Sequence, residues 1–463
     1  MILFYYISLF IGFFLIAFII RNYREVFYDL AKKSVALVNE LISDEDEDEK
    51  IDLVQANTNK LALALGKMLL YILVAFIIGS IPVIIYCLVT QSSFSSLNLT
   101  SLFSIITISL GATIPFLLPN KNKTNSEYSE LSQLLHKMAL DNYNLSDKLF
   151  KNETKKIKRK GFTNRNDFVI ISGLARAGTT SLMNDLSKID NFVSLSYANM
   201  PFLMCPSLWA KLYKPKDISL KERSHKDGIM IGYNSNEALE EYFFKVKAKD
   251  SYIHESYVTE YKIANEDYTD YLDYQTNIKR DNNKVYLAKN NNFIVRYKSV
   301  REYNDDFVFV ILFRDPITHT ASLYEKHKYY KNTQKDDHFI LDYMNWLGHY
   351  EFGLNQKPFV FNGLSKEFVE DEKDSMDFWL NSWINYYSYV LTIEHPNTIL
   401  VNYDSYCKNP KEIINSIIAK TGIDVTLPEY VPFNNARSNK EVYSGELYTN
   451  ALEIYNQLCS RVS

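Results

Sequence analysis

Phe168-Val-Ile-Ile-Ser172 runs directly into Gly173-Leu-Ala-Arg-Ala-Gly178-Thr179-Thr180-Ser181, and this stretch decides the fold. The first segment is short, apolar and rich in β-branched residues, which predicts a buried strand of a parallel sheet. Leu182-Met-Asn-Asp-Leu-Ser187 follows with the spacing of a helix. A strand, a loop bounded by glycines and a helix together direct backbone N–H groups at a phosphate or sulfate. The sequence therefore predicts an α/β domain with a P-loop-like parallel sheet flanked by helices.

The loop has the Gly-x-x-x-x-Gly spacing of a nucleotide triphosphate site but lacks its lysine. Thr179 stands where that motif places the Lys that reaches the β- and γ-phosphates. The cation of this loop is Arg176, inside it. These differences favour a ligand with a shorter anionic chain and no bound metal. The alternative is a structural strand–helix turn that contains two glycines.

A second apolar strand is predicted at Phe307-Val-Phe-Val-Ile-Leu-Phe313, followed by Arg314-Asp-Pro316 and a helix. An arginine at the carboxyl end of a parallel strand lies where open sheets bind ligands, and its planar fork suits a terminal phosphate. Ser322, about two helical turns further on, is placed to add a hydroxyl to the same group. Alone, the segment also fits an ordinary helix start in which Asp315 caps the helix and Pro316 is its first residue.

Taken together, the two segments resemble the donor-binding elements of the sulfotransferase superfamily. The segments Lys289–Asn292, with Arg296 after it, and Trp346–Gly353 resemble a bacterial branch of that superfamily. The chain departs from the family's usual loop, which has Pro and Ser where this chain has Ala175 and Ala177. The resemblance covers about 168–425 and includes a late strand at Thr398–Tyr403. It implies sulfuryl transfer from 3′-phosphoadenosine 5′-phosphosulfate to a hydroxyl or amine, without a metal cofactor. The donor residues that it implies are Arg176, Ala177, Gly178, Thr179, Thr180, Ser181, Arg314 and Ser322, with Arg176 and Lys289 as catalytic cations.

The proton acceptor is expected among the acidic and histidine residues between the two motifs. Glu237, Glu240 and Glu241 are spaced so that Glu237 shares a helix face with either of the others. A carboxylate pair raises one pKa, which makes Glu237 a candidate base; the alternative is a solvated helix face. His225 is a second candidate. His319, His327 and His349 are interpreted as structural or acceptor-pocket residues.

Three apolar segments precede this domain. Residues 1–20 carry no charge, and none occurs between Met68 and Asn120, where a polar turn at 91–101 separates segments at 68–90 and 102–118. Each segment approaches the length that crosses a bilayer, which predicts three transmembrane helices. The alternative for 68–118 is a buried hairpin of a soluble protein. Lys and Arg follow the first span, precede the second and follow the third: Arg21, Arg24, Lys32, Lys33, Lys60, Lys67, Lys121 and Lys123.

This charge distribution predicts an integral membrane protein whose catalytic domain faces the cytoplasm. The expected organisation is a membrane region at 1–120 with a helical cytoplasmic loop at 21–67, a polar and basic connector at 121–165, and the sulfotransferase domain at 166–463. Membrane attachment favours a lipid, glycolipid or polysaccharide precursor as the acceptor, beside small molecules.

Composition narrows the remaining alternatives. The formal net charge of −4 argues against a nucleic-acid partner held by a general basic field. The four cysteines are far apart, which indicates neither a disulfide framework nor a zinc site. High Asn, Lys and Tyr usage is typical of a bacterium with an AT-rich genome. Two other functions stay open: a P-loop-type nucleotide kinase or NTPase, and an inactive membrane scaffold with the sulfotransferase fold.

Overall fold

The structure of this chain of 463 residues is a computed structural model. The structure describes residues 1–42, 47–118, 130–212, 221–222, 230–231, 238–433 and 445–462. It divides into two compact units, Met1–Thr124 and Asn125–Ser463, which we call the N-terminal unit and the C-terminal unit.

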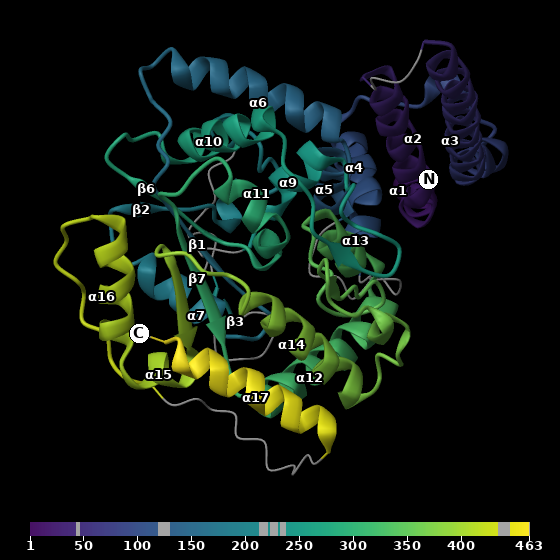
Figure 1. Cartoon of the computed structure of the whole chain (residues 1–463). Coiled ribbons are helices and arrows are strands. Elements are labelled where there is room, and N and C mark those ends of the chain that lie inside the picture. The colour runs from purple at the N-terminus through teal and green to yellow at the C-terminus, as the bar shows by residue number, and fades with distance from the viewer. Residues whose placement is uncertain are drawn as a thin grey trace. The chain divides into compact units, whose positions relative to one another are not determined.

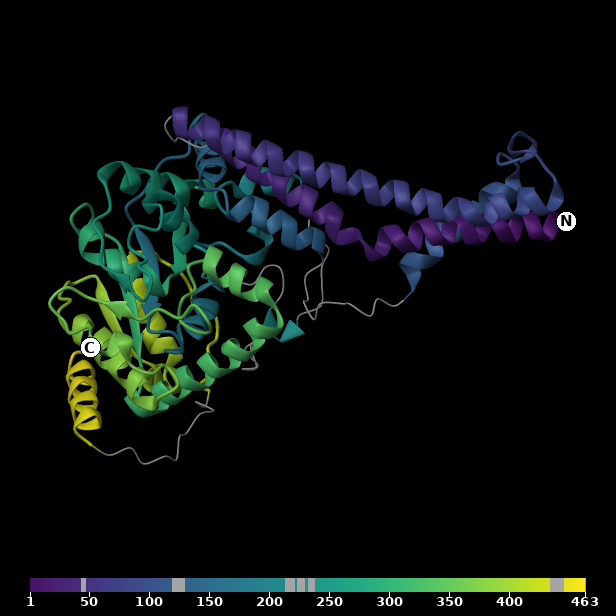
Figure 2. The ribbon, with the colours of Figure 1, turned by 90° about the vertical axis from the view of Figure 1, so that its right-hand side faces the viewer.

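The N-terminal unit is helical throughout its described elements. It contains α1 (Ile2–Asn22), α2 (Arg24–Ile42), α3 (Glu47–Thr90) and α4 (Leu102–Leu117). Figure 2 shows α1 and α2 lying along α3. Two of these helices, Ile2–Asn22 and Leu53–Thr90, are long and apolar enough to cross a membrane, while α4 has 16 residues. At 44 residues, α3 is longer than the segment expected at 68–90, because the helix continues through Lys60 and Lys67.

Glycines let these helices approach closely. A Cβ atom built on Gly12 of α1 would lie 2.5 Å from the carbonyl oxygen of Gly79 in α3, and one on Gly111 of α4 would lie 2.7 Å from that of Phe10. Small residues at such crossings are typical of helices that pack in lipid. Arg21 donates hydrogen bonds to the carbonyls of Pro115 and Leu118, which lack helical partners at the end of α4.

The C-terminal unit is built on the parallel sheet that the sequence predicts. Its strands are β1 (Phe168–Gly173), β2 (Phe192–Val193), β6 (Val285–Lys289), β7 (Val308–Phe313) and β9 (Thr398–Asn402), in the order β2-β6-β1-β7-β9. All four pairings are parallel. Ile171 lies beside Lys289 and Gly173 beside Leu312, so the carboxyl ends of β6, β1 and β7 meet at one edge.

Helices cover both faces of this sheet (Figure 1). Strand residues alternate between faces: Val169 and Ile171 join the core formed with α7 and α16, and Phe168 and Ile170 join the larger aromatic core on the other face. The helices of the unit are α5 (Glu130–Leu140), α6 (Tyr143–Lys158), α7 (Thr179–Leu186), α8 (Pro206–Leu212), α9 (Glu241–Ala248), α10 (Asn265–Lys279), α11 (Tyr297–Arg301), α12 (Pro316–Asp336), α13 (His338–Trp346), α14 (Met376–Val390), α15 (Tyr403–Lys408), α16 (Pro410–Thr421) and α17 (Glu446–Ser460).

The remaining strands form two-residue pairs: β3 (Lys221–Glu222) with β4 (Met230–Ile231), and β5 (Val258–Thr259) with β8 (Phe359–Val360). The segment expected as a connector at 121–165 contains α5 and α6. Phe150 and Ile157 of α6 are buried. The described part of this segment is therefore a folded part of the C-terminal unit.

Candidate anion-binding site at the carboxyl edge of the sheet

The loop between β1 and α7 curls tightly above the middle strand of the sheet. The N–H of Ala177 donates to the carbonyl of Leu174 at 3.0 Å, which closes the turn. Arg176 has φ 70°, and Gly178, the N-cap of α7, has φ 102°. Glycine is needed at 178 for space as well as for φ, because a Cβ atom there would lie 2.1 Å from Cδ2 of Tyr403. This turn places the first N–H groups of α7 at the sheet edge, where a helix leaves them without helical acceptors.

The structure brings the two predicted anion-binding segments together. Nε of Arg176 donates to Oγ of Ser322 on α12 at 3.3 Å. One terminal nitrogen of Arg314 donates to the backbone carbonyl of Arg176 at 3.2 Å. Arg314 is 5% exposed, and its guanidinium lies 5.1 Å from the ring centre of Tyr403. Two guanidinium groups from strand ends that are neighbours in the sheet therefore share one site.

Asp315 and Pro316 have the roles that the sequence gives them in a helix start. The carboxylate of Asp315 accepts from the backbone N–H of Thr318 at 2.8 Å, and Pro316 is the first residue of α12. This cap fixes where α12 begins and so aims Ser322 at the loop. The helix-start interpretation of Asp315 and Pro316 is therefore confirmed, and anion binding by Arg314 and Ser322 stays a prediction.

Lys289 completes the cationic edge from the other side of β1. It is the last residue of β6, is 6% exposed, and donates from Nζ to Oγ1 of Thr180 at 3.0 Å. Thr180 and Ser181 lie in the first turn of α7, and Thr179 begins it. The loop is thus flanked by Lys289 on one neighbouring strand and Arg314 on the other.

His319, which the sequence analysis interprets as a structural or acceptor-pocket residue, connects the loop to α12. Its Nε2 lies 2.7 Å from the carbonyl oxygen of Ala175, which can only accept, so Nε2 carries the proton. Burial and the cations of Arg314 and Arg176 lower the pKa of His319 to about 3. The ring is therefore neutral. His319 and Ser322 are three positions apart, which puts them on one face of a helix. This spacing was the feature of the sequence that could have indicated that His319 lies beside the loop.

Glu240 and Glu241 are buried, so the alternative of a solvated helix face is wrong for both. Nδ2 of Asn290, directly after Lys289, donates to Glu240 at 2.9 Å and to Glu241 at 3.0 Å. Arg296 binds Glu241 through two hydrogen bonds of 2.6 Å each. Burial raises the pKa of Glu240 to about 6, although hydrogen bonds from Tyr271 and Asn290 oppose it.

Glu351 and His349 form a second acidic and basic pair near Lys289. Nδ1 of His349 lies 3.5 Å from Oε1 of Glu351, whose side chain is 13% exposed. Burial raises the pKa of Glu351, but His349 and Lys289 lower it more, and the net result is below the usual value. An ionised carboxylate near the cationic edge is suited to accept a proton. The His-x-Glu spacing in the segment 346–353 was the feature of the sequence that could have indicated this pair.

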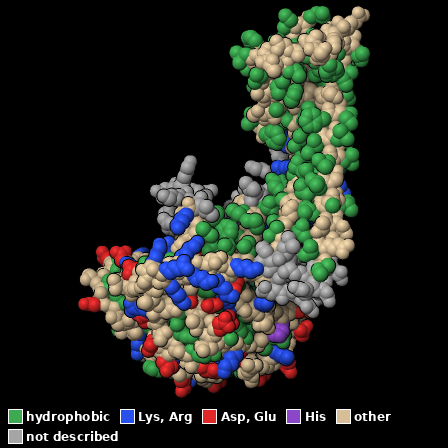
Figure 3. All heavy atoms as spheres, turned by 90° about the horizontal axis from the view of Figure 1, so that it is seen from above, with side chains coloured by type: hydrophobic (Ala, Val, Ile, Leu, Met, Phe, Trp, Pro, Cys, Tyr) green, Lys and Arg blue, Asp and Glu red, His purple; other side chains and the backbone are tan. Residues whose placement is uncertain are grey.

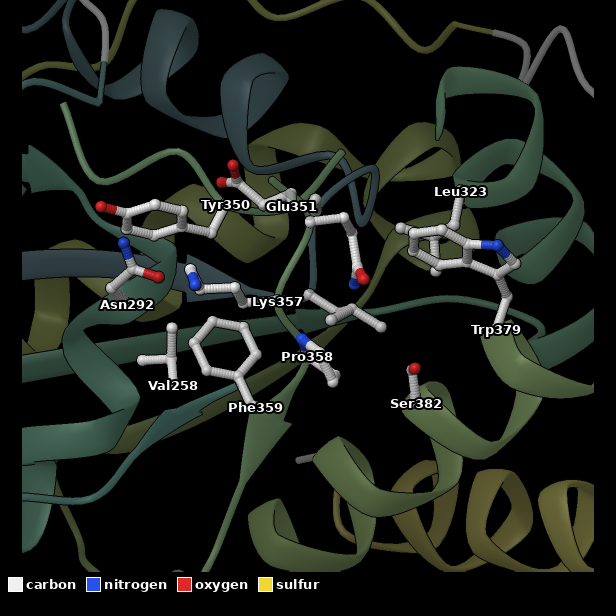
Figure 4. Close-up of a pocket in the computed structure, with 13 residues that line it drawn as sticks. Val258, Asn292, Leu323, Tyr350, Glu351, Lys357, Pro358, Phe359, Trp379 and Ser382 are labelled. Carbon is white, nitrogen blue, oxygen red and sulfur yellow. The ribbon is translucent and has the colours of Figure 1, made fainter. Parts of the chain in front are cut away.

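Glu351 also borders a small internal cavity of about 20 Å³ behind the loop. Figure 4 shows Tyr350, Val258 and Phe359 on one side of this cavity and Trp379 with Ser382 on the other. Leu174 and Ala175 of the loop line it as well. The lining is mostly apolar with a few polar groups, and the volume is that of about one water molecule.

The other candidates for the base, His225 and Glu237, lie outside the described residues. His327 is buried under Trp379, with ring centres 5.2 Å apart. Burial lowers the pKa of His327 to about 4. This agrees with its interpretation as a structural residue.

No family model matches the chain, and no curated protein matches it. Among solved structures, the sulfotransferase STF1 from Mycobacterium tuberculosis is similar, with 12% sequence identity. The match covers 72% of this chain and 83% of that chain, with a TM-score of 0.37.

Proposed function

We propose that this chain is a membrane-attached sulfotransferase that takes the sulfuryl group of 3′-phosphoadenosine 5′-phosphosulfate. The observation that carries the proposal is the convergence of Arg176, Arg314, Ser322 and Lys289 at one sheet edge. A donor with a 5′-phosphosulfate and a separate 3′-phosphate needs two anion sites on one sheet. The chain offers a loop-and-helix site after β1 and an arginine–serine site after β7.

The two sites divide the donor between them. The loop around Arg176, the first turn of α7 and the hydroxyl of Thr180 are suited to the phosphosulfate, because these groups are donors at a helix N-terminus. Arg314 and Ser322 are suited to the 3′-phosphate, since a guanidinium binds a terminal phosphate with two parallel bonds. Thr179 in place of a P-loop lysine disfavours a triphosphate.

Sulfuryl transfer requires little covalent work from the protein. The acceptor oxygen forms a bond to sulfur while the bond from sulfur to the bridging oxygen breaks, which leaves adenosine 3′,5′-bisphosphate and a sulfate ester. Lys289, held against Thr180, is placed to neutralise charge on the departing oxygen. Preorganised cations of this kind act without reorganisation during the reaction.

The acceptor proton needs a base, and Glu351 with His349 is the pair best placed for it. Their separation of 3.5 Å lets the carboxylate orient the imidazole or share its proton. Lys289 lies close enough to help hold the pKa of Glu351 down. In this proposal Glu240 and Glu241 support Asn290 behind the site, and they are not the base.

The N-terminal unit is proposed to hold the enzyme in a membrane through α1 and α3, with α4 as a third span and the catalytic unit in the cytoplasm. The length and apolar character of Ile2–Asn22 and Leu53–Thr90 support this. Attachment favours an acceptor that is itself at the membrane, such as a lipid, a glycolipid or a polysaccharide precursor.

Ligand binding to the purified full chain tests the donor assignment. Adenosine 3′,5′-bisphosphate should raise the Tm of the protein, whereas ATP with Mg²⁺ should not. Arg314→Ala should weaken binding roughly 10- to 100-fold, the usual loss for a hydrogen-bonded charge. Arg280→Ala, at an exposed arginine on the C-cap of α10, is the matched control.

Selective stabilisation by ATP would favour the kinase or NTPase alternative and contradict the proposal. Stabilisation by neither ligand would favour an inactive scaffold. Incubation of membranes with ³⁵S-labelled donor, followed by identification of the labelled product, then identifies the acceptor.

A further inference from the structure

Helix α6 presents two different faces. Phe150, Thr154 and Ile157 are buried against the C-terminal unit. The acidic side chains of the helix are also engaged within the fold. Asp147 pairs with Lys151 and with Lys247, and both oxygens of Glu153 accept backbone N–H groups at the start of α8, at 2.9 Å each.

The exposed face near the end of α6 carries four basic side chains. Lys155, Lys156, Arg159 and Lys160 are exposed, and among the described residues none of the four pairs with a carboxylate. Lys155 and the C-cap residue Arg159 are four positions apart, and Lys160 follows directly after the end of α6. Like charges at this spacing repel each other and weaken a helix. This face therefore gains from an external anionic partner.

Figure 3 looks down on the top of Figure 1, where α6 lies, and shows Lys and Arg side chains gathered on that face of the C-terminal unit. We infer that Lys155, Lys156, Arg159 and Lys160, which we call the α6 basic face, bind the anionic headgroups of a lipid bilayer. The inference rests on the proposed membrane attachment, and it is independent of donor binding.

Two observations favour a lipid surface as the partner. The face consists of long, exposed and flexible side chains, which suit a fluid layer of headgroups better than a shaped protein pocket. It lies at the end of α6, whose opposite face is buried, about forty residues after α4 in the sequence. Clusters of four to eight Lys and Arg residues on an amphipathic helix are typical of segments that bind anionic lipid.

Lysine footprinting of the full chain in nanodiscs tests this directly. We expect acetylation of Lys155, Lys156 and Lys160 to be several-fold slower in discs that contain phosphatidylglycerol than in discs of phosphatidylcholine alone. The exposed Lys411 and Lys420 of α16 are internal controls whose labelling should not change. High salt should abolish the protection, because it screens surface charge within a few ångströms.

A charge-removal variant makes the test specific. Lys155→Gln/Lys156→Gln/Arg159→Gln leaves Lys160 as the reporter. Since each cation favours contact with an anionic surface about fivefold, the equilibrium constant for docking should fall roughly 100-fold, and Lys160 should label at nearly the unprotected rate. The matched variant Lys408→Gln/Lys411→Gln/Lys420→Gln removes equal charge and should keep the protection of Lys160.

Several outcomes overturn the inference. Equal labelling in both lipid compositions does so, as does unchanged protection of Lys160 in the first variant. Protection that requires an added nucleic acid instead of anionic lipid assigns the face to another partner. Failure of the chain to co-elute with nanodiscs at all contradicts the membrane attachment itself, and adenosine bisphosphate binding reports separately on the donor site.

Discussion

Gly178→Ala tests the geometry of the loop most severely. At φ 102° an L-residue is strained by roughly 1–2 kcal/mol. The added Cβ would lie 2.1 Å from Cδ2 and 2.2 Å from Cε2 of Tyr403, whereas carbon atoms in contact are about 3.5 Å apart or more. The ring or the loop must therefore move by more than an ångström, and such overpacking typically costs about 1–3 kcal/mol more. The expected loss of stability is roughly 2–5 kcal/mol.

The same displacement should abolish donor binding, because the ring of Tyr403 also packs against Arg314. Titration with adenosine 3′,5′-bisphosphate by calorimetry measures the affinity, and thermal unfolding measures the stability. Gly422→Ala is the matched control, since Gly422 has φ 66° and open space around its Cβ position, so that only the conformational strain remains. If Gly178→Ala and Gly422→Ala change stability and affinity equally, the steric argument is wrong. A second variant, Gly178→Ala/Tyr403→Ser, should recover part of the stability by removing the ring.

Two further predictions concern the proposed base and the apolar helices of the N-terminal unit. Glu351→Gln should lower kcat at least about 100-fold with little effect on adenosine bisphosphate affinity. Because the pKa of Glu351 is lowered in the folded protein, its carboxylate stays ionised and contributes stability down to about pH 4.5, and this contribution is lost as the pH falls through the folded-state pKa. If kcat/KM instead falls off on the acid side near pH 6, the base is Glu240, whose pKa is about 6. Gly12→Ala should lower the Tm in detergent, because its Cβ would lie 2.5 Å from a carbonyl oxygen, whereas Gly66→Ala, with nothing within 4 Å, should not. Equal Tm values for these two variants would show that close packing at Gly12 is unimportant.

The sheet was predictable because its central strands are short, apolar and followed by unmistakable turn residues. Phe168–Gly173 and Val308–Phe313 are buried on both faces, so they appear in the sequence as continuous apolar runs. The Asp-Pro pair after β7 likewise fixes a helix start by local chemistry alone. Local signals of this kind need no knowledge of what packs against them.

The acidic pair was not predictable in the same way. Spacing indicates which side chains share a helix face, but it does not show what covers that face. Glu241 is buried because Arg296, 55 positions later, binds it with both terminal nitrogens while stacking on Phe244 at 3.9 Å. The partner of His319 was not predictable for a similar reason, since it is a loop carbonyl that only the fold brings near.

These buried groups explain how a cationic edge is held in place. Arg176, Arg314 and Lys289 repel one another, and burial strengthens that repulsion. The ion pair of Glu241 with Arg296 fixes Asn290, and so the end of β6 that carries Lys289. His319 stays neutral and adds no fourth charge. An anion that binds the three cations relieves their repulsion, so ligand binding should stabilise this unit by about 2.7 kcal/mol when the ligand is at 100 times its Kd. The same three cations therefore destabilise the ligand-free protein and favour binding of an anion. Neutralising any one of them should lower the affinity for the anion more than it lowers the free energy of unfolding.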